Sequence, residues 1–376
     1  MSIIASIRAR DGIASLHRLL ASSAGLDVWE VKPDHLVVQA TEAQADRIQQ
    51  MGYVVEQLQT TERYLSSFGA QLTTGYHSAE SLETDMRQLA ERHPEIAEVH
   101  EIGRSVENRP ILALRIGERS DSTLKMLFLG CHHAREWIAV EIPYLLAEHL
   151  LENASSSSAV QSWLRKGEVW VVPMVNPDGH EHTRTSNRLW RKNRARNRDG
   201  TVGVDPNRNY GYMWGTLDID TSSHVPGDET YVGTRAFSEP EVRAVRNLVG
   251  RELFSGVLTY HSYSQLILFP WGYTTDPIND TASRQLMEDV AGDMQNAING
   301  VHGEKYTVTQ SSGLYPTAGD TTDWTYGEFY VPSLTVELRP QTHAEGGFIL
   351  PPDQIRPTWE ENEPAALSFI GRVFGN

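Results

Sequence analysis

The stretch Leu129-Gly-Cys-His-His-Ala-Arg-Glu-Trp-Ile138 constrains the fold more than any other part of this chain. An apolar run at 126–129 predicts a buried strand of the parallel type, and an amphipathic run at 137–151 predicts a helix. The turn between them carries two histidines, an arginine and a glutamate. Ligands in open α/β sheets bind just beyond the carboxyl ends of strands, so we expect a functional site at this turn.

His133 and Glu136 are three residues apart, so an imidazole and a carboxylate can converge where the strand becomes the helix. They supply half of a zinc site built from two histidines and a glutamate. Spacing alone leaves His132 open as the ligand in place of His133. A third ligand is expected at another strand end, and His261 fits because it directly follows the apolar strand 256–260. A histidine in that place can equally be a packed core residue.

The composition is that of a globular protein, and the net charge limits the kinds of partner that the chain is expected to bind. The 376 residues suffice for one large and one small domain. A formal net charge of −16 argues against nucleic acid or an anionic membrane as the main partner. No apolar run approaches the ~18 residues of a membrane span. The single cysteine, Cys131, excludes an internal disulfide and is expected to be a small buried apolar residue.

Residues 1–59 predict a small domain of their own. Their pattern is strand, helix, strand, strand, helix, strand, at 2–8, 13–21, 26–31, 35–40, 41–51 and 53–58. This βαββαβ order is that of a ferredoxin-like open sandwich. It holds no cluster of histidine, cysteine or glutamate, so we expect no catalysis there. The polar segment 60–74 is predicted to be a linker, with Arg63 open to proteolysis.

Residues 75–376 predict an α/β sandwich around a mixed sheet. Strands are expected at 97–102, 111–116, 126–129, 169–175, 256–260, 265–269 and 334–338. Helices are expected at 81–92, 137–151, 160–164, 239–253, 281–298 and 359–373. The sequence Asn176-Pro-Asp-Gly179 predicts a turn.

The motif around His133 resembles the zinc signature of metallocarboxypeptidases of the pancreatic carboxypeptidase A/B type. Further motifs match that family in its order: Asn187-Arg-Leu-Trp-Arg-Lys192, Val204-Asp-Pro-Asn-Arg-Asn209, His261-Ser-Tyr-Ser-Gln265, Leu314-Tyr-Pro-Thr-Ala-Gly319, Asp323-Trp324 and Thr335-Val-Glu-Leu-Arg339. A lone HxxE would be weak, whereas ordered motifs over roughly residues 72 to 373 are specific. The resemblance implies an eight-stranded mixed sheet sandwiched by helices, preceded by the ferredoxin-like domain.

The resemblance also implies one Zn²⁺ per chain, held by His133, Glu136 and His261 with water in the fourth position. By the same resemblance, Asp205 orients the first histidine. From the residues alone Asp205 can equally be a turn aspartate. Glu337 matches the general base, and its position inside an apolar strand is costly unless the group is paired or functional. The alternative for Glu337 is a buried ion pair, for instance with Arg339.

Five further residues are expected by resemblance to contact the substrate. Arg208 and Asn207 match the clamp for the terminal carboxylate, and Arg191 matches the group that polarises the scissile carbonyl. Without the resemblance, the basic stretch 184–198 would be a solvated or polyanion-binding patch. Arg135 matches a residue of the outer subsites. Tyr315 matches a mobile tyrosine that closes over the bound C-terminus, although ordinary packing would also explain it.

The pocket for the C-terminal side chain is expected to accept both apolar and basic residues. By position its lining comprises Leu268, Gln310, Leu314, Thr317, Asp320, Thr322 and Thr335. Basic-specific members of the family carry aspartate at the position of Thr322, and strictly apolar-specific ones carry isoleucine. Asp320 replaces a usual glycine, and its carboxylate could pair with lysine or arginine.

Zinc-dependent removal of one residue from peptide and protein C-termini is therefore the expected function. The alternatives are a related zinc amidohydrolase acting on small N-acyl amino acids and a non-catalytic peptide-binding homologue. Residues 1–59 resemble the family's pro-segment, which predicts a zymogen activated by a protease near Arg63; a permanent folding aid is the alternative. A monomer is expected. The family is secreted, yet no signal peptide is recognised, so a cytoplasmic location, another export route and a missing leader stay open.

Overall fold

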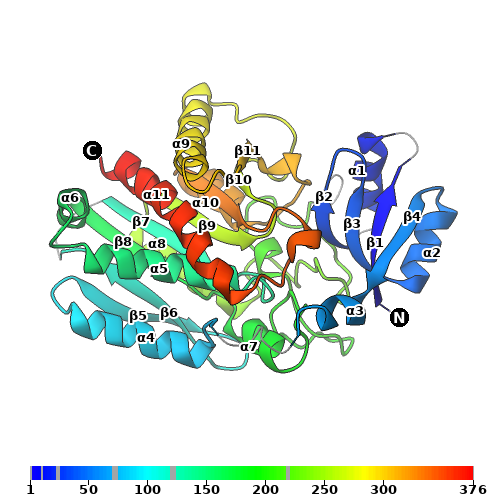
Figure 1. Ribbon diagram of the computed structural model, residues 1–376, viewed down its shortest axis with the longest axis horizontal. Helices are drawn as coiled ribbons and strands as arrows, with labels where there is room; N and C mark the ends of the chain where they lie inside the picture. Colours follow the sequence, from blue (N-terminus) through cyan, green and yellow to red (C-terminus); the bar gives the residue numbers. More distant parts are fainter. Residues whose placement is uncertain are drawn as a thin grey trace.

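Eight strands form a central mixed sheet in the order β11-β10-β12-β9-β7-β8-β6-β5, and helices cover both of its faces (Figure 1). The structure is a computed structural model that describes residues 2–9, 12–22, 26–69, 75–118, 124–216 and 221–375. Its strands are β5 (Ala97–Arg104), β6 (Pro110–Ile116), β7 (Leu124–Gly130), β8 (Gly167–Val172), β9 (Gly256–Ser262), β10 (Leu266–Phe269), β11 (Thr307–Gln310) and β12 (Ser333–Leu338). The predicted fold class is confirmed.

Alternation along β7 divides the interior into two hydrophobic layers, because successive side chains of a strand point to opposite faces. Met126 and Phe128 pack into one layer, and Leu127 and Leu129 pack into the other. Helices on the first face are α4 (Ala79–Arg92), α5 (Ile138–Glu152), α6 (Ser158–Lys166), α9 (Thr281–Asn299) and α11 (Ile355–Phe374). Helices on the second face are α8 (Pro240–Glu252) and α10 (Thr321–Phe329). No helix in the described ranges has the length and apolar character needed to cross a membrane.

The N-terminal residues form a separate four-stranded antiparallel sheet in the order β2-β3-β1-β4. Its elements are β1 (Ser2–Arg8), α1 (Ile13–Ser22), β2 (Asp27–Val31), β3 (Leu36–Thr41), α2 (Glu42–Gln50) and β4 (Val54–Thr60). This is the predicted βαββαβ order. Thr41 caps α2 in a capping box with Gln44, as its hydroxyl accepts from the Gln44 amide. The small sheet lies beside the large one in Figure 1.

Two segments differ from their predicted conformation, and β11 and α10 lie where the sequence patterns predict no element. The expected linker contains α3 (Thr61–Ser66), which the Thr60 hydroxyl caps, and the buried Tyr64 anchors it by donating to the Gly346 carbonyl at 2.6 Å. Residues 70–74 of that linker lie outside the described residues. The expected turn at Asn176 starts α7 (Pro177–Thr185) instead, because the Asn176 side chain accepts from Gly179 and Pro177 occupies the first helical turn.

The parallel pairing of β7 with β9, and of β9 with β12, aligns three carboxyl ends at one edge of the sheet. Gly130 pairs with Tyr260, so the turn after β7 begins beside the last residues of β9. Glu337 on β12 pairs with His261 on β9. Residues 130 positions apart (Gly130 and Tyr260) and 76 positions apart (His261 and Glu337) are thereby placed on adjacent strands.

Candidate active site

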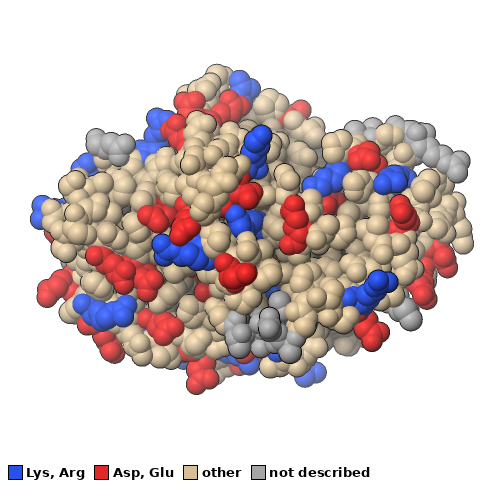
Figure 2. All heavy atoms as spheres, viewed as in Figure 1, with Lys and Arg blue, Asp and Glu red and all other residues tan. Residues whose placement is uncertain are grey.

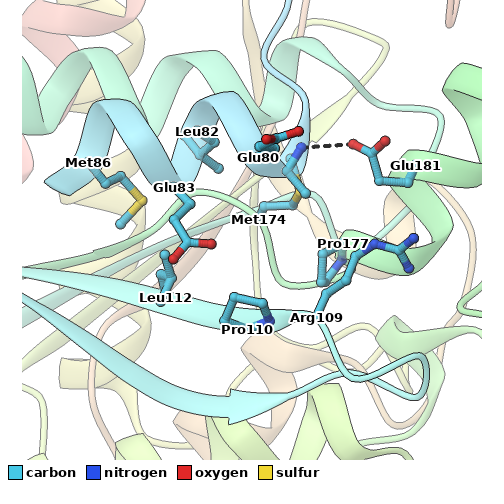
Figure 3. Close-up of a pocket in the computed structure, with 11 residues that line it drawn as sticks. Glu80, Leu82, Glu83, Met86, Arg109, Pro110, Leu112, Met174, Pro177 and Glu181 are labelled. Carbon is cyan, nitrogen blue, oxygen red and sulfur yellow. Dashed lines mark hydrogen bonds between the residues drawn. The ribbon is translucent and has the colours of Figure 1, made fainter. Parts of the chain in front are cut away.

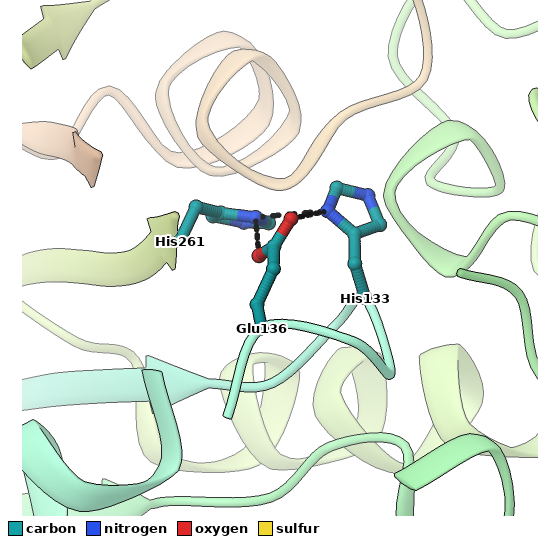
Figure 4. Close-up of side chains that lie close together, drawn as sticks. All are labelled: His133, Glu136 and His261. Atoms are coloured by element: carbon teal, nitrogen blue, oxygen red, sulfur yellow. Dashed lines mark hydrogen bonds and ion pairs between the residues drawn. The ribbon is translucent and has the colours of Figure 1, made fainter. Parts of the chain in front are cut away.

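His133, Glu136 and His261 converge at the carboxyl ends of β7 and β9 (Figure 4). Nδ1 of His133 lies 2.7 Å from Oε1 of Glu136, and Nδ1 of His261 lies 3.0 Å from Oε2. The two Nδ1 atoms are 3.1 Å apart. At most one of two facing imidazole nitrogens can donate to the other, so at least one lone pair points at the shared space. A cation between these donors would satisfy all of them.

Burial makes this cluster of donors costly without a cation. All three side chains are buried, and Nε2 of His261 has no hydrogen-bond partner among the described residues. Burial lowers the pKa of His261 and so favours the neutral imidazole, which is the metal-binding form. Burial opposes the ionisation of Glu136, but the electrostatic effect and hydrogen bonds of the two adjacent imidazoles outweigh burial and lower the pKa of the Glu136 carboxyl. The donors are therefore suited to a divalent metal.

Asp205 contacts His133 at the ring nitrogen that does not face Glu136. Its Oδ1 lies 3.2 Å from Nε2 of His133, and its Oδ2 accepts from Nε and Nη2 of Arg191 at 3.0 and 2.8 Å. The Asp205 carboxyl is completely buried, which by itself raises its pKa, but Arg191 and His133 hold that pKa well below the usual range. A fixed anion at Nε2 directs Nδ1 of His133 toward Glu136. Asp205 also accepts from the Asn207 amide, so it is a turn aspartate as well.

His132 faces a different environment. Its Nε2 lies 2.8 Å from the Tyr210 hydroxyl and 3.1 Å from Oγ1 of Thr321. Burial, followed by the neighbouring histidines, lowers the pKa of His132 well below its ordinary value. The ring is a neutral scaffold group, and the choice between His132 and His133 falls on His133.

A cleft opens beside the three metal-binding candidates and contains Glu337. The residues that line it are His133, Asn207, Arg208, His261, Leu268, Ser311, Leu314, Tyr315, Thr317, Asp320, Thr322, Thr335 and Glu337. Burial, followed by the charge of Glu136, raises the pKa of Glu337. The alternative partner of Glu337 is excluded, because Arg339 bonds Glu361 and Gln354 instead.

Arg208 brings a buried positive charge to the cleft. Its Nη1 donates to the Asn207 carbonyl at 2.8 Å, while its Nε has no hydrogen-bond partner, and no carboxylate in the described ranges pairs with it. The Asn207 side-chain oxygen accepts from the amide and hydroxyl of Thr321, which leaves the amide hydrogens of Asn207 to donate. An unpaired buried guanidinium is costly, so this wall of the cleft is suited to an incoming carboxylate.

Two of the predicted substrate-binding arginines lie outside the residues that line this cleft. Arg191 is held by Asp205 through Nε and Nη2. Arg135 is fully buried, and its Nη1 and Nη2 each donate to a carboxylate oxygen of Asp27 at 2.6 Å. Asp27 belongs to β2 of the N-terminal sheet, so the two domains meet at Arg135.

Comparison with known proteins gives the family. A zinc carboxypeptidase family model matches residues 82–365. The chain is 34% identical to carboxypeptidase O of Homo sapiens over 80% of this chain and 79% of that protein. It is 36% identical to carboxypeptidase B of Astacus astacus over 77% of this chain and 93% of that protein. The crystal structure of carboxypeptidase A from Helicoverpa armigera superposes with a TM-score of 0.85 at 26% identity over 98% of each chain.

The chain belongs to the zinc carboxypeptidase family. It is a metallocarboxypeptidase, and zinc is its cofactor. The donor set fits zinc, since two imidazole nitrogens and one carboxylate are the ligands of catalytic zinc sites that keep a coordination position open. The structural match includes the N-terminal sheet as well as the catalytic sheet.

One residue of this carboxypeptidase cleft gives no signal in the sequence, and one predicted residue lies elsewhere. Ser311 lines the cleft and donates to the Phe269 carbonyl, but a serine in a turn gives no signal of such a place. Gln310 is not among the lining residues, because its amide donates to the carbonyls of Trp271, Thr274 and Asp276. The other six pocket residues predicted from the sequence do line the cleft.

Replacing a metal ligand should remove zinc, whereas replacing the adjacent histidine should not. We expect His133→Asn to lose its zinc because the site then has one imidazole fewer, and His132→Asn to keep close to one zinc per chain. Zinc content after dialysis, measured by plasma mass spectrometry, provides the check, with circular dichroism as the control for folding. Equal zinc loss in both folded variants would refute the assignment.

Proposed function

We propose that this protein hydrolyses the C-terminal peptide bond of peptides and proteins, and that the chain of 376 residues is its zymogen. The observation that carries the first part is the unpaired, buried Arg208 in the same cleft as His133, His261 and Glu337. A free α-carboxylate is the anion that distinguishes a peptide C-terminus from internal peptide groups. Arg208 with Asn207 would hold that carboxylate, which sets the last peptide bond against the metal-binding residues.

The chemistry is divided among the surrounding side chains. Bound zinc polarises a carbonyl group and lowers the pKa of a water molecule. Glu337, beside His261 on the adjacent strand, accepts a proton from the attacking water and delivers it to the nitrogen of the leaving amine. Arg191 contacts Asp205 through Nε and Nη2, so these contacts do not use Nη1. We propose that Nη1 donates to the carbonyl oxygen of the substrate as negative charge develops on that oxygen.

Preference for apolar and basic C-terminal residues is proposed from the pocket. Leu268 and Leu314 supply apolar wall, and Asp320 supplies a carboxylate. Asp320 caps α10 by accepting from the Asp323 amide, and it also accepts from the hydroxyls of Thr317 and Thr322. These bonds hold the carboxylate in place without neutralising its charge, so cations are attracted and a C-terminal Asp or Glu is repelled.

The N-terminal domain supports the zymogen proposal by its contacts with Arg135. Asp27 offers this arginine a carboxylate in bidentate geometry, which is the kind of contact that a substrate would make. Phe348 of the catalytic domain packs over the Arg135 guanidinium at 3.9 Å and against the Trp29 ring at 5.3 Å. Glu30 accepts from the His343 amide and the Tyr263 hydroxyl. Any substrate reaching Arg135 must displace these contacts.

The cleft is narrow in this form of the chain. Tyr315 packs against the hydrophobic core of the N-terminal domain, and the Arg208 guanidinium lies 6.0 Å from its ring centre. The cavity volume of the cleft is about 40 Å³, far below the ~300 Å³ at the lower end of typical ligand sites. We infer a pro-segment at 1–59, a connecting segment at 60–74 and a catalytic domain at 75–376. Arg63 is exposed in α3, so a protease near this residue has to unwind that helix.

Loss of the proton acceptor should abolish turnover without loss of metal. We expect Glu337→Gln to lower kcat on a blocked dipeptide by roughly 10²- to 10⁴-fold, the usual contribution of general acid–base catalysis. Zinc content should stay at that of the unmodified chain because Glu337 is not a ligand. A folded, zinc-loaded variant with full kcat would exclude this role.

Charge at Asp320 should select for basic C-termini. Matched peptides ending in Phe, Arg and Glu should be cleaved readily for Phe and Arg and slowest for Glu. Asp320→Asn keeps a residue suited to the N-cap of α10 but removes the charge. We expect this variant to lower kcat/KM for Arg by about tenfold or more and to change that for Phe little. Glu released fastest, or an equal loss for Phe and Arg, would contradict the proposal.

Separation of the N-terminal domain should raise activity. Removing one partner of a buried ion pair destabilises the folded state by about 3–5 kcal/mol. Asp27→Ala should therefore weaken the docking of the N-terminal domain and increase activity in the intact chain. Limited trypsin digestion should have a larger effect, and Arg63→Gln should protect the bond after residue 63. If clean removal of residues 1–63 leaves activity unchanged, the domain is a folding aid.

A further inference from the structure

A second cavity lies outside the cleft, between α4, the start of β6 and α7 (Figure 3). Its volume is about 330 Å³, within the range of small-molecule sites. No residue that lines it also lines the cleft. The zinc carboxypeptidase chemistry described above therefore makes no use of it.

The floor of this cavity is apolar and rigid. It is formed by Leu82 and Met86 of α4, Leu112 of β6, and Met174 before α7. Each of the four side chains is buried and belongs to the main hydrophobic core of the catalytic domain. A floor held by core packing is present before any ligand arrives, so little ordering is needed on binding.

The rim carries three carboxylates. Glu181 of α7 uses Oε1 to accept from the Ala79 amide at 2.8 Å, and Glu83 uses Oε1 to accept from Arg87. In each case no group in the described ranges donates to Oε2, and none bonds the Glu80 carboxylate. Figure 3 shows Glu83 reaching from α4 toward Leu112, over the apolar floor. Acceptor oxygens are therefore available at both sides of the cavity.

The cations beside the rim do not offset these charges, because Arg87 pairs with Glu83 and no ion pair among the described residues involves Glu80 or Glu181. Nη1 of Arg109 donates to Glu107 and to the buried Asp178, at 2.7 Å in each case. Those two carboxylates carry more charge than this one guanidinium can neutralise. The field at the cavity is consequently negative, and the apolar floor favours a ligand with a hydrocarbon body.

We propose that this cavity binds a small organic cation, a primary ammonium group carried on a short arm from an aromatic or aliphatic body. The body lies on Met86, Leu112 and Met174, and the ammonium donates to the free oxygens of Glu80, Glu83 and Glu181. An ammonium has three donors and no acceptor, which suits a rim of carboxylates. This site is independent of the proposed peptidase function.

The probe for the test is 2-phenylethylammonium, with 2-phenylethanol as its neutral counterpart of the same shape. The full chain is labelled with ¹³C at its methionine methyl groups. Of the eight methionines, Met86 and Met174 line the cavity. We expect saturable methyl shifts at these two residues alone, and binding of the alcohol weaker by about tenfold or more because it lacks the charge. Binding in the cleft would leave both signals in place.

Two variants separate charge from shape. In the Glu80→Gln, Glu181→Gln double variant the glutamine at 181 can still accept from the Ala79 amide, so α4 keeps its contact while the rim loses two charges. We expect its affinity for the ammonium probe to fall by about tenfold or more, while the exposed Glu328→Gln control leaves it unchanged. Equal binding of amine and alcohol, or absence of saturable shifts at Met86 and Met174 in the unmodified chain, would overturn the proposal.

Discussion

The parallel register of β7, β9 and β12 is the constraint on which the site depends. It brings the turn after β7 beside the end of β9 and sets Glu337 next to His261. His133, Glu136 and His261 are buried and Glu337 is half-buried, and each of these polar groups would be costly alone. Together they share a common space where a cation and a substrate satisfy them, so the stability of the sheet and the chemistry of the site are linked.

A second buried contact joins the two domains. Arg135, within the metal-binding turn, forms a bidentate ion pair with Asp27 of the N-terminal sheet. Trp29 and Phe348 pack against the Arg135 guanidinium and shield the pair from water. The charge of Arg135 is thus neutralised from outside the catalytic domain. On the face shown in Figure 2, acidic and basic side chains are interspersed without a continuous basic patch, in keeping with the negative net charge.

Sequence patterns were sufficient where a local rule decides the structure. The run 126–129 and the spacing of His133 and Glu136 predicted a strand end with converging ligands, and the resemblance supplied His261 and Glu337. Sequence patterns are insufficient where a partner that is distant in sequence decides the local structure. The sequence at Asn176 predicts a turn because the side-chain chemistry that caps α7 is also that of a turn, and nothing local predicts α3 because Tyr64 is stabilised by the distant Gly346. The partnership of Arg135 with Asp27 leaves no trace in either local sequence.

The central claim is that His133, Glu136 and His261 bind one zinc ion. The most direct measurement is anomalous X-ray diffraction from crystals of the zinc-loaded full chain, recorded on both sides of the zinc absorption edge. We expect a single anomalous peak about 2.0–2.2 Å from Nδ1 of both histidines and from the Glu136 carboxylate. A peak coordinated by His132, or a zinc-loaded crystal with no peak between these three residues, would contradict it.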